Sequence, residues 1–165
     1  MMITLTGFMG SGKTTVGKVL ADFLGCPFMD LDDLVVKKAG KSIPDIFAQD
    51  GEPAFRELEA RMLRQTVAKY AESTAVLALG GGAVLAPASA VLLQEKTVCI
   101  YLRATLDTLL ARLEGETAGR PLADDALAER LASREPIYEK TAHVIIDTDG
   151  LSPDEVADEI IISAL

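Results

Sequence analysis

The sequence contains no asparagine and no tryptophan, and it has only one histidine and two cysteines among 165 residues. Because asparagine is absent, the NKxD motif with which GTPases recognise guanine cannot be present. The single histidine, His143, excludes a metal site built from several histidines, and its position before an apolar run favours a structural role at a strand edge. Cys26 and Cys99 are far apart and lack CxxC spacing, so we expect two free thiols and neither a disulfide framework nor a zinc site.

Long hydrophobic runs and positive charge are also scarce. No apolar stretch approaches the roughly 18 residues that a membrane-spanning helix requires. Lysine and arginine number 16 against 25 aspartates and glutamates, which gives a net charge of −9 at pH 7. Such a surface repels nucleic acid and anionic membranes, so neither is an expected partner, and an anionic ligand would require a local basic cluster. With no basic leader segment at the amino terminus, we expect a cytoplasmic protein.

The length suits one domain over residues 1–165, in which short apolar runs alternate with segments of helical period. The predicted strands are 3–6, 28–29, 75–79, 97–102 and 144–146, and the predicted helices are 13–24, 31–40, 42–50, one beginning at 53 and one beginning at 153. This alternation predicts a three-layer α/β/α fold with a five-stranded parallel sheet. The polar stretch 114–125 is rich in turn-forming residues and predicts a mobile loop or a flexible surface connection.

Residues 7–14 spell GFMGSGKT, a complete match to the phosphate-loop pattern GxxxxGK[ST]. The motif follows a predicted strand and opens a predicted helix, which is the context that it requires. Its glycines let backbone N–H groups point at phosphate oxygens, and the helix N-terminus adds partial positive charge. We predict that Lys13 contacts the β- and γ-phosphates and that the Thr14 hydroxyl binds Mg²⁺. The residues predicted to bind ATP here are Gly10, Ser11, Gly12, Lys13, Thr14 and Thr15.

An acidic pair, Asp30 and Asp32, follows the second predicted strand. No strand ends in the Asp-Glu pair typical of motor and transporter ATPases, so the carboxylate that serves Mg²⁺ must come from this pair. On an extended chain the two side chains point to the same side, and ligands of parallel sheets lie beyond the carboxyl ends of the strands. One carboxylate is expected to serve the metal, and the other to orient the attacking hydroxyl or accept its proton. A solvated helix-capping cluster is the alternative, and we prefer it for Asp33.

Arg56 and Glu59 lie three residues apart on a predicted helix, so they are expected to form an ion pair, with Phe47 and Phe55 as apolar neighbours. Together with Arg134, Arg56 can form a fork onto a carboxylate. The alternative for each arginine is a solvated surface role.

Arg120 lies in the polar stretch, where an arginine suits a lid that closes over the transferring phosphate. After the third predicted strand, Gly80, Gly81 and Gly82 permit a close approach of backbone to a ligand, and a tight turn is the alternative. The DxxG sequence at 147–150 comes after the last strand, so we interpret it as a turn.

These segments resemble the shikimate kinases over nearly the whole chain. The matching segments are GFMGSGKT (7–14), DLD (30–32), FAQDGEPAFRELE (47–59), LGGGAV (79–84), GRPL (119–122) and REPIY (134–138). The phosphate loop is common to many P-loop proteins, whereas the run 47–59, followed in order by GGG, RPL and RxPxY, is specific to this family. The resemblance implies a P-loop fold of the nucleoside-monophosphate kinase type, usually monomeric, with substrate-binding helices over about 31–60 and a mobile lid over about 112–125.

The resemblance also implies transfer of the γ-phosphoryl group of ATP to the 3-hydroxyl of shikimate, with Mg²⁺ as cofactor, in aromatic amino acid biosynthesis. Lys13, Asp32 and Arg120 would be catalytic, and Asp30 would serve the metal together with Thr14. The shikimate-binding residues would be Asp32, Phe47, Phe55, Arg56, Glu59, Gly80, Gly81, Gly82 and Arg134.

The start of the implied lid departs from the family pattern. Family members often carry an arginine there that packs on adenine, whereas this chain has Glu114 and Glu116 and only Arg112 nearby, slightly out of register. Arg112 and Arg120 are therefore the ATP contacts expected outside the phosphate loop. Two rival hypotheses remain: a kinase of the same fold for gluconate or a nucleoside monophosphate, and a non-catalytic nucleotide-binding module. The second is disfavoured because Lys13, Asp32 and the arginines are all present.

Overall fold

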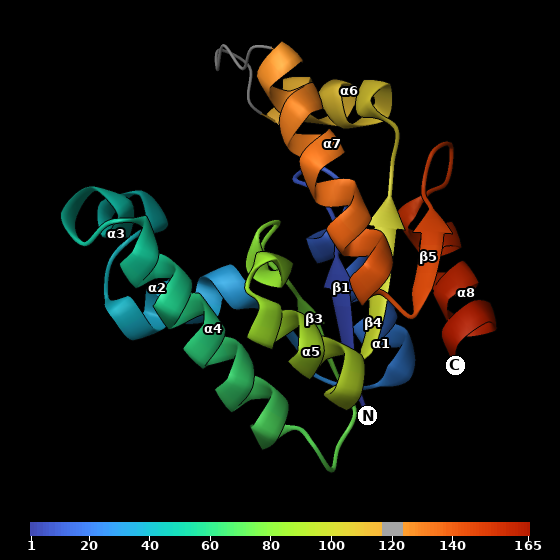
Figure 1. Cartoon of the computed structure of the whole chain (residues 1–165). Helices are drawn as coiled ribbons and strands as arrows, with labels where there is room; N and C mark the ends of the chain where they lie inside the picture. The colour runs from blue at the N-terminus through green and yellow to red at the C-terminus, as the bar shows by residue number, and fades with distance from the viewer. Residues whose placement is uncertain (117–123) are drawn as a thin grey trace.

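The computed structural model describes residues 1–116 and 124–165, and Figure 1 shows how their elements are arranged. The strands are β1 (Met2–Thr6), β2 (Phe28–Asp30), β3 (Ala75–Ala78), β4 (Val98–Arg103) and β5 (Val144–Asp147). The α-helices are α1 (Lys13–Leu24), α2 (Leu31–Ala39), α3 (Ile43–Gln49), α4 (Glu52–Lys69), α5 (Pro87–Lys96), α6 (Leu106–Glu116), α7 (Asp124–Thr141) and α8 (Pro153–Ala164). A short 3₁₀ helix, η1 (Ala83–Leu85), follows β3.

The strands form one parallel sheet in the order β2-β3-β1-β4-β5, which confirms the predicted fold class. The register pairs Leu5 and Asp30 with Ala78, and Thr6 with Tyr101. The carboxyl ends of the four neighbouring strands β2, β3, β1 and β4 therefore meet at one edge. This edge receives the phosphate loop after β1, the acidic pair after β2 and the three glycines after β3.

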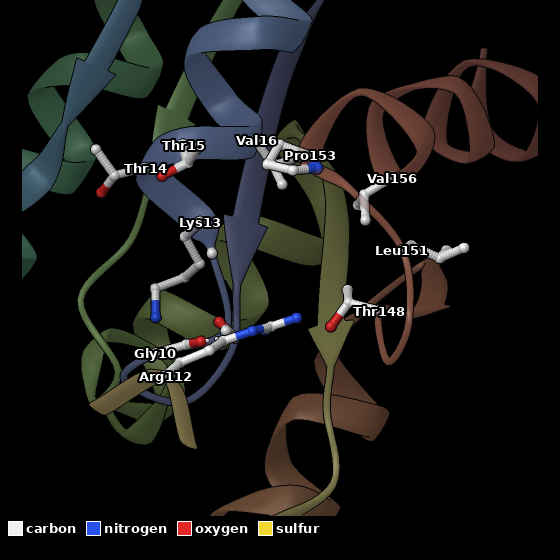
Figure 2. Close-up of a pocket in the computed structure, with 12 residues that line it drawn as sticks. Gly10, Lys13, Thr14, Thr15, Val16, Arg112, Thr148, Leu151, Pro153 and Val156 are labelled. Carbon is white, nitrogen blue, oxygen red and sulfur yellow. Dashed lines mark hydrogen bonds between the residues drawn. The ribbon is translucent and has the colours of Figure 1, made fainter. Parts of the chain in front are cut away.

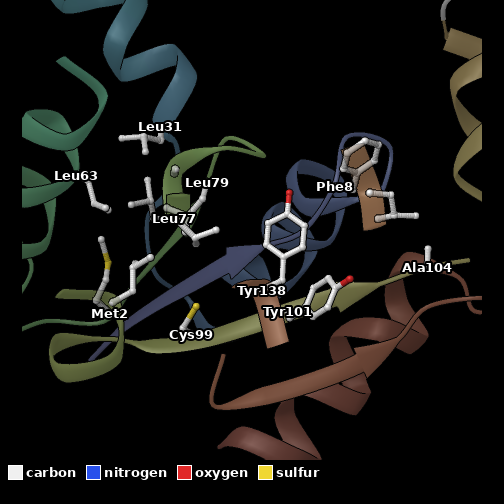
Figure 3. Packing of buried hydrophobic residues seen from close by; sticks show 14 of the residues in the cluster. Met2, Phe8, Leu31, Leu63, Leu77, Leu79, Cys99, Tyr101, Ala104 and Tyr138 are labelled. Carbon is white, nitrogen blue, oxygen red and sulfur yellow. The ribbon is translucent and has the colours of Figure 1, made fainter. Parts of the chain in front are cut away.

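Helices cover both faces of the sheet, because each face presents a separate apolar cluster. On one face, α1 and α8 pack side chains such as Val16, Leu20 and Ile160 against the strands. On the other face, α4, α5 and α7 contribute to a larger cluster that includes Leu63 and Tyr138 (Figure 3). Burial of both faces explains why the strands are continuous apolar runs rather than alternating ones.

The predicted strands agree with the structure to within a residue or two at each end, and the five predicted helices are all present. The N-terminus of α8 has the expected capping box between Ser152 and Glu155. Three helices, α5, α6 and α7, had no sequence prediction. The loop predicted over 114–125 is wrong at both ends, because α6 continues to Glu116 and α7 begins at Asp124. Within the described ranges, no helix combines the length and apolarity needed to cross a bilayer.

The residues interpreted as structural have that role. The backbone N–H of Cys99 donates to Nδ1 of His143 at 2.9 Å, and the ring Nε2 lies 2.9 Å from the carbonyl of Gln94. Both cysteines are free thiols. In the DxxG turn, Asp147 pairs with Arg103 at 2.6 Å, and a positive φ of 75° at Gly150 explains why glycine occupies the turn.

Candidate active site

The phosphate loop connects β1 to α1 and curls around the side chain of Lys13. Gly10 and Gly12 adopt positive φ angles of 82° and 93°, which only glycine adopts without strain. Lys13 Nζ donates to the carbonyl of Gly7 at 2.6 Å and to that of Phe8 at 3.0 Å, so the ammonium lies over the loop. Burial lowers the pKa of Lys13 to about 8, although the nearby carboxylates of Asp32 and Asp30 oppose this shift.

A cavity of about 340 Å³ opens beside this loop (Figure 2). Every residue predicted from the motif lines it: Gly10, Ser11, Gly12, Lys13, Thr14 and Thr15. The Ser11 hydroxyl is buried there and has no hydrogen-bond partner among the described residues. A loop of backbone donors, a lysine and an unsatisfied hydroxyl form a binding site for an anion such as a phosphate chain.

The far side of this cavity comes from elements that the motif did not indicate. These lining residues are Arg112, Thr148, Leu151, Pro153 and Val156, most of which lie at or near the N-terminus of α8, while Val16 of α1 continues the stretch after the motif. Their sequence signal was the capped start of a helix directly after the last strand, but only the contact between α1 and α8 places that start beside the phosphate loop.

Arg112 lies on α6 and reaches the phosphate loop. Its Nη1 donates to the carbonyl of Gly10 at 3.2 Å, and its side chain lines the cavity beside the phosphate loop (Figure 2). The structure therefore brings Arg112 to the loop on which the sequence prediction placed ATP. Arg120, the predicted lid arginine, lies outside the described residues.

The acidic pair is organised differently from its prediction. Asp30 ends β2 and caps α2, because its Oδ1 accepts from the backbone N–H of Asp32 at 2.9 Å. The prediction that both acids lie on extended chain is wrong, since Asp32 is in the first turn of α2. The Thr14 hydroxyl donates to Asp30 Oδ2 at 3.0 Å, which joins the acidic segment to the phosphate loop. The cap also explains why the chain turns into a helix immediately after β2.

A second cavity, of about 310 Å³, includes Asp32 in its lining. Its lining includes every described residue that was predicted to bind the acceptor: Asp32, Phe47, Phe55, Arg56, Glu59, Gly80, Gly81, Gly82 and Arg134. Met9, Ile43 and Arg130 also line it and were not predicted. We call this space the acceptor cavity.

Arg56 is held in place inside the acceptor cavity. Its Nη1 donates to Glu59 Oε1 at 2.9 Å, and its guanidinium carbon lies 5.2 Å from the centroid of the Phe55 ring. Phe47 packs against Phe55 in a tilted arrangement, with 4.9 Å between ring centroids. Burial raises the pKa of Glu59, although the hydrogen bond from Arg56 opposes this shift. The predicted ion pair and its apolar neighbours are therefore present.

The three glycines after β3 leave space for the charged side chains around them. A Cβ atom on Gly82 would lie 2.5 Å from Arg56 Nη1, and one on Gly81 would lie 3.2 Å from Arg134 Nη1. The carbonyl of Gly81 accepts a hydrogen bond of 2.5 Å from the hydroxyl of buried Tyr138. Residues 80–83 also form a tight turn, in which the N–H of Ala83 donates to the carbonyl of Gly80 at 3.1 Å, and the approach of this backbone to a ligand stays a prediction.

Asp32 and Lys13 connect the two cavities. Asp32 lines the acceptor cavity, while Lys13 lines the cavity beside the phosphate loop. The charge of each side chain affects the pKa of the other. Burial, followed by the neighbouring charge of Asp30, raises the pKa of Asp32. Arg134 is also close enough to contribute to the electrostatics of Lys13. The arrangement is suited to a transfer between an anion on the loop and a second molecule beside Asp32.

Comparisons with known proteins agree with this geometry. A model of the shikimate kinase family matches residues 9–164. A shikimate kinase of Enterococcus faecalis is 43% identical over 164 residues, which cover 96% of this chain and 95% of the relative. A solved shikimate kinase from Acinetobacter baumannii in complex with shikimate superposes with a TM-score of 0.87 and 34% identity, covering 97% of this chain and 90% of the other. The shikimate kinase structure from Bacteroides thetaiotaomicron gives a TM-score of 0.89 at 30% identity, with coverages of 99% and 98%. The chain therefore belongs to the shikimate kinase family, whose members are ATP-dependent phosphotransferases.

Proposed function

We propose that this protein transfers the γ-phosphoryl group of ATP to the 3-hydroxyl of shikimate and releases ADP and 3-phosphoshikimate. The observation that carries the proposal is the pair of cavities on either side of Lys13 and Asp32. One cavity has the lining expected for a phosphate chain, and the other contains the Asp32 carboxylate, Arg56 held by Glu59, Arg134 and the glycine backbone after β3. Phosphoryl transfer requires little covalent chemistry from a protein, so positioning and charge stabilisation account for most of its catalysis.

ATP binding is assigned to the cavity beside the phosphate loop. The residues proposed to contact the triphosphate are Gly10, Ser11, Gly12, Lys13, Thr14 and Thr15. Lys13 would leave the loop carbonyls that it now contacts and place its ammonium on the β- and γ-phosphates. Arg112 would stack on or border the adenine, opposite the wall formed by Leu151 and Pro153.

Thr14 and Asp30 are proposed to hold Mg²⁺. Their oxygens are hard ligands, lie 3.0 Å apart and are on the rim of the phosphate loop, which suits an ion that binds one or two protein oxygens together with phosphate oxygens and water. When bound, Mg²⁺ would neutralise charge on the β- and γ-phosphates. Asp30 is already oriented by the backbone N–H of Asp32, so its carboxylate needs little rearrangement for this role.

Shikimate binding is assigned to the acceptor cavity. Arg56 and Arg134 would bind the shikimate carboxylate, with Glu59 fixing Arg56. Asp32 would orient the 3-hydroxyl and accept its proton, a role favoured by its raised pKa and its position next to Lys13. The ring would lie between the glycines Gly80–Gly82 and the aromatic pair Phe47 and Phe55.

Further parts of the proposal rest on family resemblance. Arg120 would stabilise the transferring phosphoryl group when a lid closes. The protein would act as a monomer in the cytoplasm. The two free thiols are consistent with that compartment.

A coupled ADP-release assay tests the proposed function. The assay contains ATP and Mg²⁺ and compares shikimate with gluconate and nucleoside monophosphates as acceptors. We expect turnover with shikimate to exceed that with any other member of the panel, whereas a higher rate with gluconate or a nucleotide would assign the fold to a different acceptor. The Asp32→Asn variant should lower kcat more than it raises the KM for shikimate, since it removes the proton acceptor but retains a polar group.

A further inference from the structure

The acceptor cavity contains one cationic side chain to which the proposed function gives no role. Arg130 and Arg134 lie four residues apart on α7, so their side chains are neighbours on the same face of the helix. Both line the acceptor cavity. α7 therefore brings two guanidinium groups to this cavity, one turn apart, while the family motif RxPxY includes only the second.

Arg130 differs from Arg56 in how its charge is used within the protein. Arg56 is paired with Glu59 at 2.9 Å and with Glu52 at 3.6 Å. Arg130 is exposed, and its guanidinium forms no ion pair with the acidic side chains of residues 1–113 and 125–165. Its charge is therefore available to a ligand without the cost of breaking an internal ion pair.

Arg130 also determines the sign of the charge on the cavity wall. Three guanidinium groups and two carboxylates line the cavity: Arg56, Arg130, Arg134, Asp32 and Glu59. With Arg130 the wall has one positive charge in excess, and without it the formal charges would cancel. Since the whole protein has a net charge of −9, an anionic acceptor approaches against an unfavourable field. A local positive excess at the cavity offsets that field.

We propose that Arg130 is a third guanidinium contact for the anionic acceptor, and that it sets the affinity of the acceptor cavity for carboxylate-bearing molecules. This inference rests on the proposed function and identifies a residue that determines its specificity. Arg130 binds the acceptor on the solvent-exposed side of the cavity and takes no part in the chemical step. Its loss should therefore change the KM for the acceptor and not kcat.

The test compares three variants: Arg130→Gln, Arg130→Lys and the control Arg64→Gln. Arg64 is an exposed arginine of α4 outside the acceptor cavity, so its substitution makes the same change in net charge at another place. Shikimate binding is measured by titration calorimetry without ATP, and kcat and both KM values are measured at low and high salt. Calorimetry suits this protein because it contains no tryptophan to report binding by fluorescence.

We expect Arg130→Gln to weaken shikimate binding and raise its KM by roughly 5- to 10-fold, with kcat and the KM for ATP within about 2-fold of wild type. Arg130→Lys should restore most of the affinity, and high salt should reduce the difference between wild type and Arg130→Gln. Unchanged shikimate binding in Arg130→Gln, or an equal loss in Arg64→Gln, would overturn the inference.

The same measurements separate this inference from the proposed function. A wild-type protein that binds shikimate but does not phosphorylate it would contradict the proposed function, while the calorimetric comparison would still decide the role of Arg130. A wild-type protein that does not bind shikimate at all would overturn both.

Discussion

The two cavities of the active site are built in contrasting ways. The cavity beside the phosphate loop takes most of its lining from one unbroken stretch, residues 10–16, which includes one lysine. The acceptor cavity draws on helices α2, α3, α4 and α7 and on the loop after β3, and charged side chains make up much of its lining. A loop of backbone donors depends on a local sequence pattern, whereas a set of dispersed side chains depends on the packing of the whole domain. Changes in the acceptor cavity should therefore alter acceptor use and leave ATP binding intact.

The largest expected effect is on the nucleotide side. Lys13→Met should fold normally but lower kcat by at least roughly 100-fold, because it removes the charge that stabilises the transferring phosphoryl group. Circular dichroism checks the fold, and ADP release checks the rate. Lys18→Met, an exposed lysine of the same helix, is the matched control. A rate near that of wild type for Lys13→Met would remove the phosphate loop from the mechanism.

The next effect should be confined to the acceptor cavity. Arg56→Ala is expected to lower kcat/KM for shikimate by roughly 30-fold, which corresponds to a loss of about 2 kcal/mol of transition-state stabilisation. The substitution removes a charge-assisted contact and leaves Glu59 unpaired in a buried position. The KM for ATP should change little. Arg61→Ala, an exposed arginine on the same helix, serves as the control. A comparable rise in the KM for ATP would show that the two cavities are not independent.

The pH dependence of ATP binding tests the contribution of Lys13 to the cavity beside the phosphate loop. The pKa of Lys13 is lowered to about 8, so the ammonium is charged below that pH and neutral above it. Phosphate binds the charged form, and ATP affinity should therefore be highest below pH 8 and fall by up to about 10-fold for each pH unit above it. Titration of ATP between pH 7 and pH 9.5 measures this fall. Constant affinity across that range would contradict the assignment of Lys13 as the phosphate contact.

The smallest predicted effect comes from Tyr138, which is not among the residues that line the acceptor cavity. Tyr138→Phe removes the hydroxyl that donates to the carbonyl of Gly81, which should cost about 1 kcal/mol and raise the KM for shikimate by roughly 5-fold. The KM for ATP and kcat should stay within about 2-fold. Tyr101→Phe is the control, because Tyr101 packs on Tyr138 at 5.0 Å in the same buried cluster (Figure 3). An equal effect of both substitutions would show that the Tyr138 hydroxyl has no specific effect on shikimate binding.

Much of the nucleotide side could be predicted from sequence because its residues are adjacent in the chain. The pattern from Gly7 to Thr14 specifies a turn, a helix start and a lysine, and all of these are present in the structure. Arg112 and the wall around Pro153 were harder to predict. They come from α6 and α8, and tertiary packing, including the contact between α1 and α8, places them beside the loop.

The acceptor side shows where reasoning from local sequence fails. The prediction for Asp30 and Asp32 chose the correct residues but the wrong geometry, because the Asp30 cap turns the chain into a helix before Asp32 is reached. Helix α7 was missed because its apolar residues do not form a regular stripe, and Pro136 lies within it. Without α7, the neighbouring positions of Arg130 and Arg134 on one face were not evident.

The sequence by itself determined the alternation of strands and helices, the phosphate loop and the identity of most charged residues in the site, because these depend on local patterns of apolarity, glycine and charge. Only the tertiary structure decided which of those charges face one another. The parallel sheet gathers the carboxyl ends of β1, β2 and β3 at one edge, and the packing of α4 and α7 brings their arginines to that edge. Contacts between residues far apart in the chain, such as the hydrogen bond between Tyr138 and Gly81, which are 57 positions apart, follow from that packing and are not encoded in any local pattern.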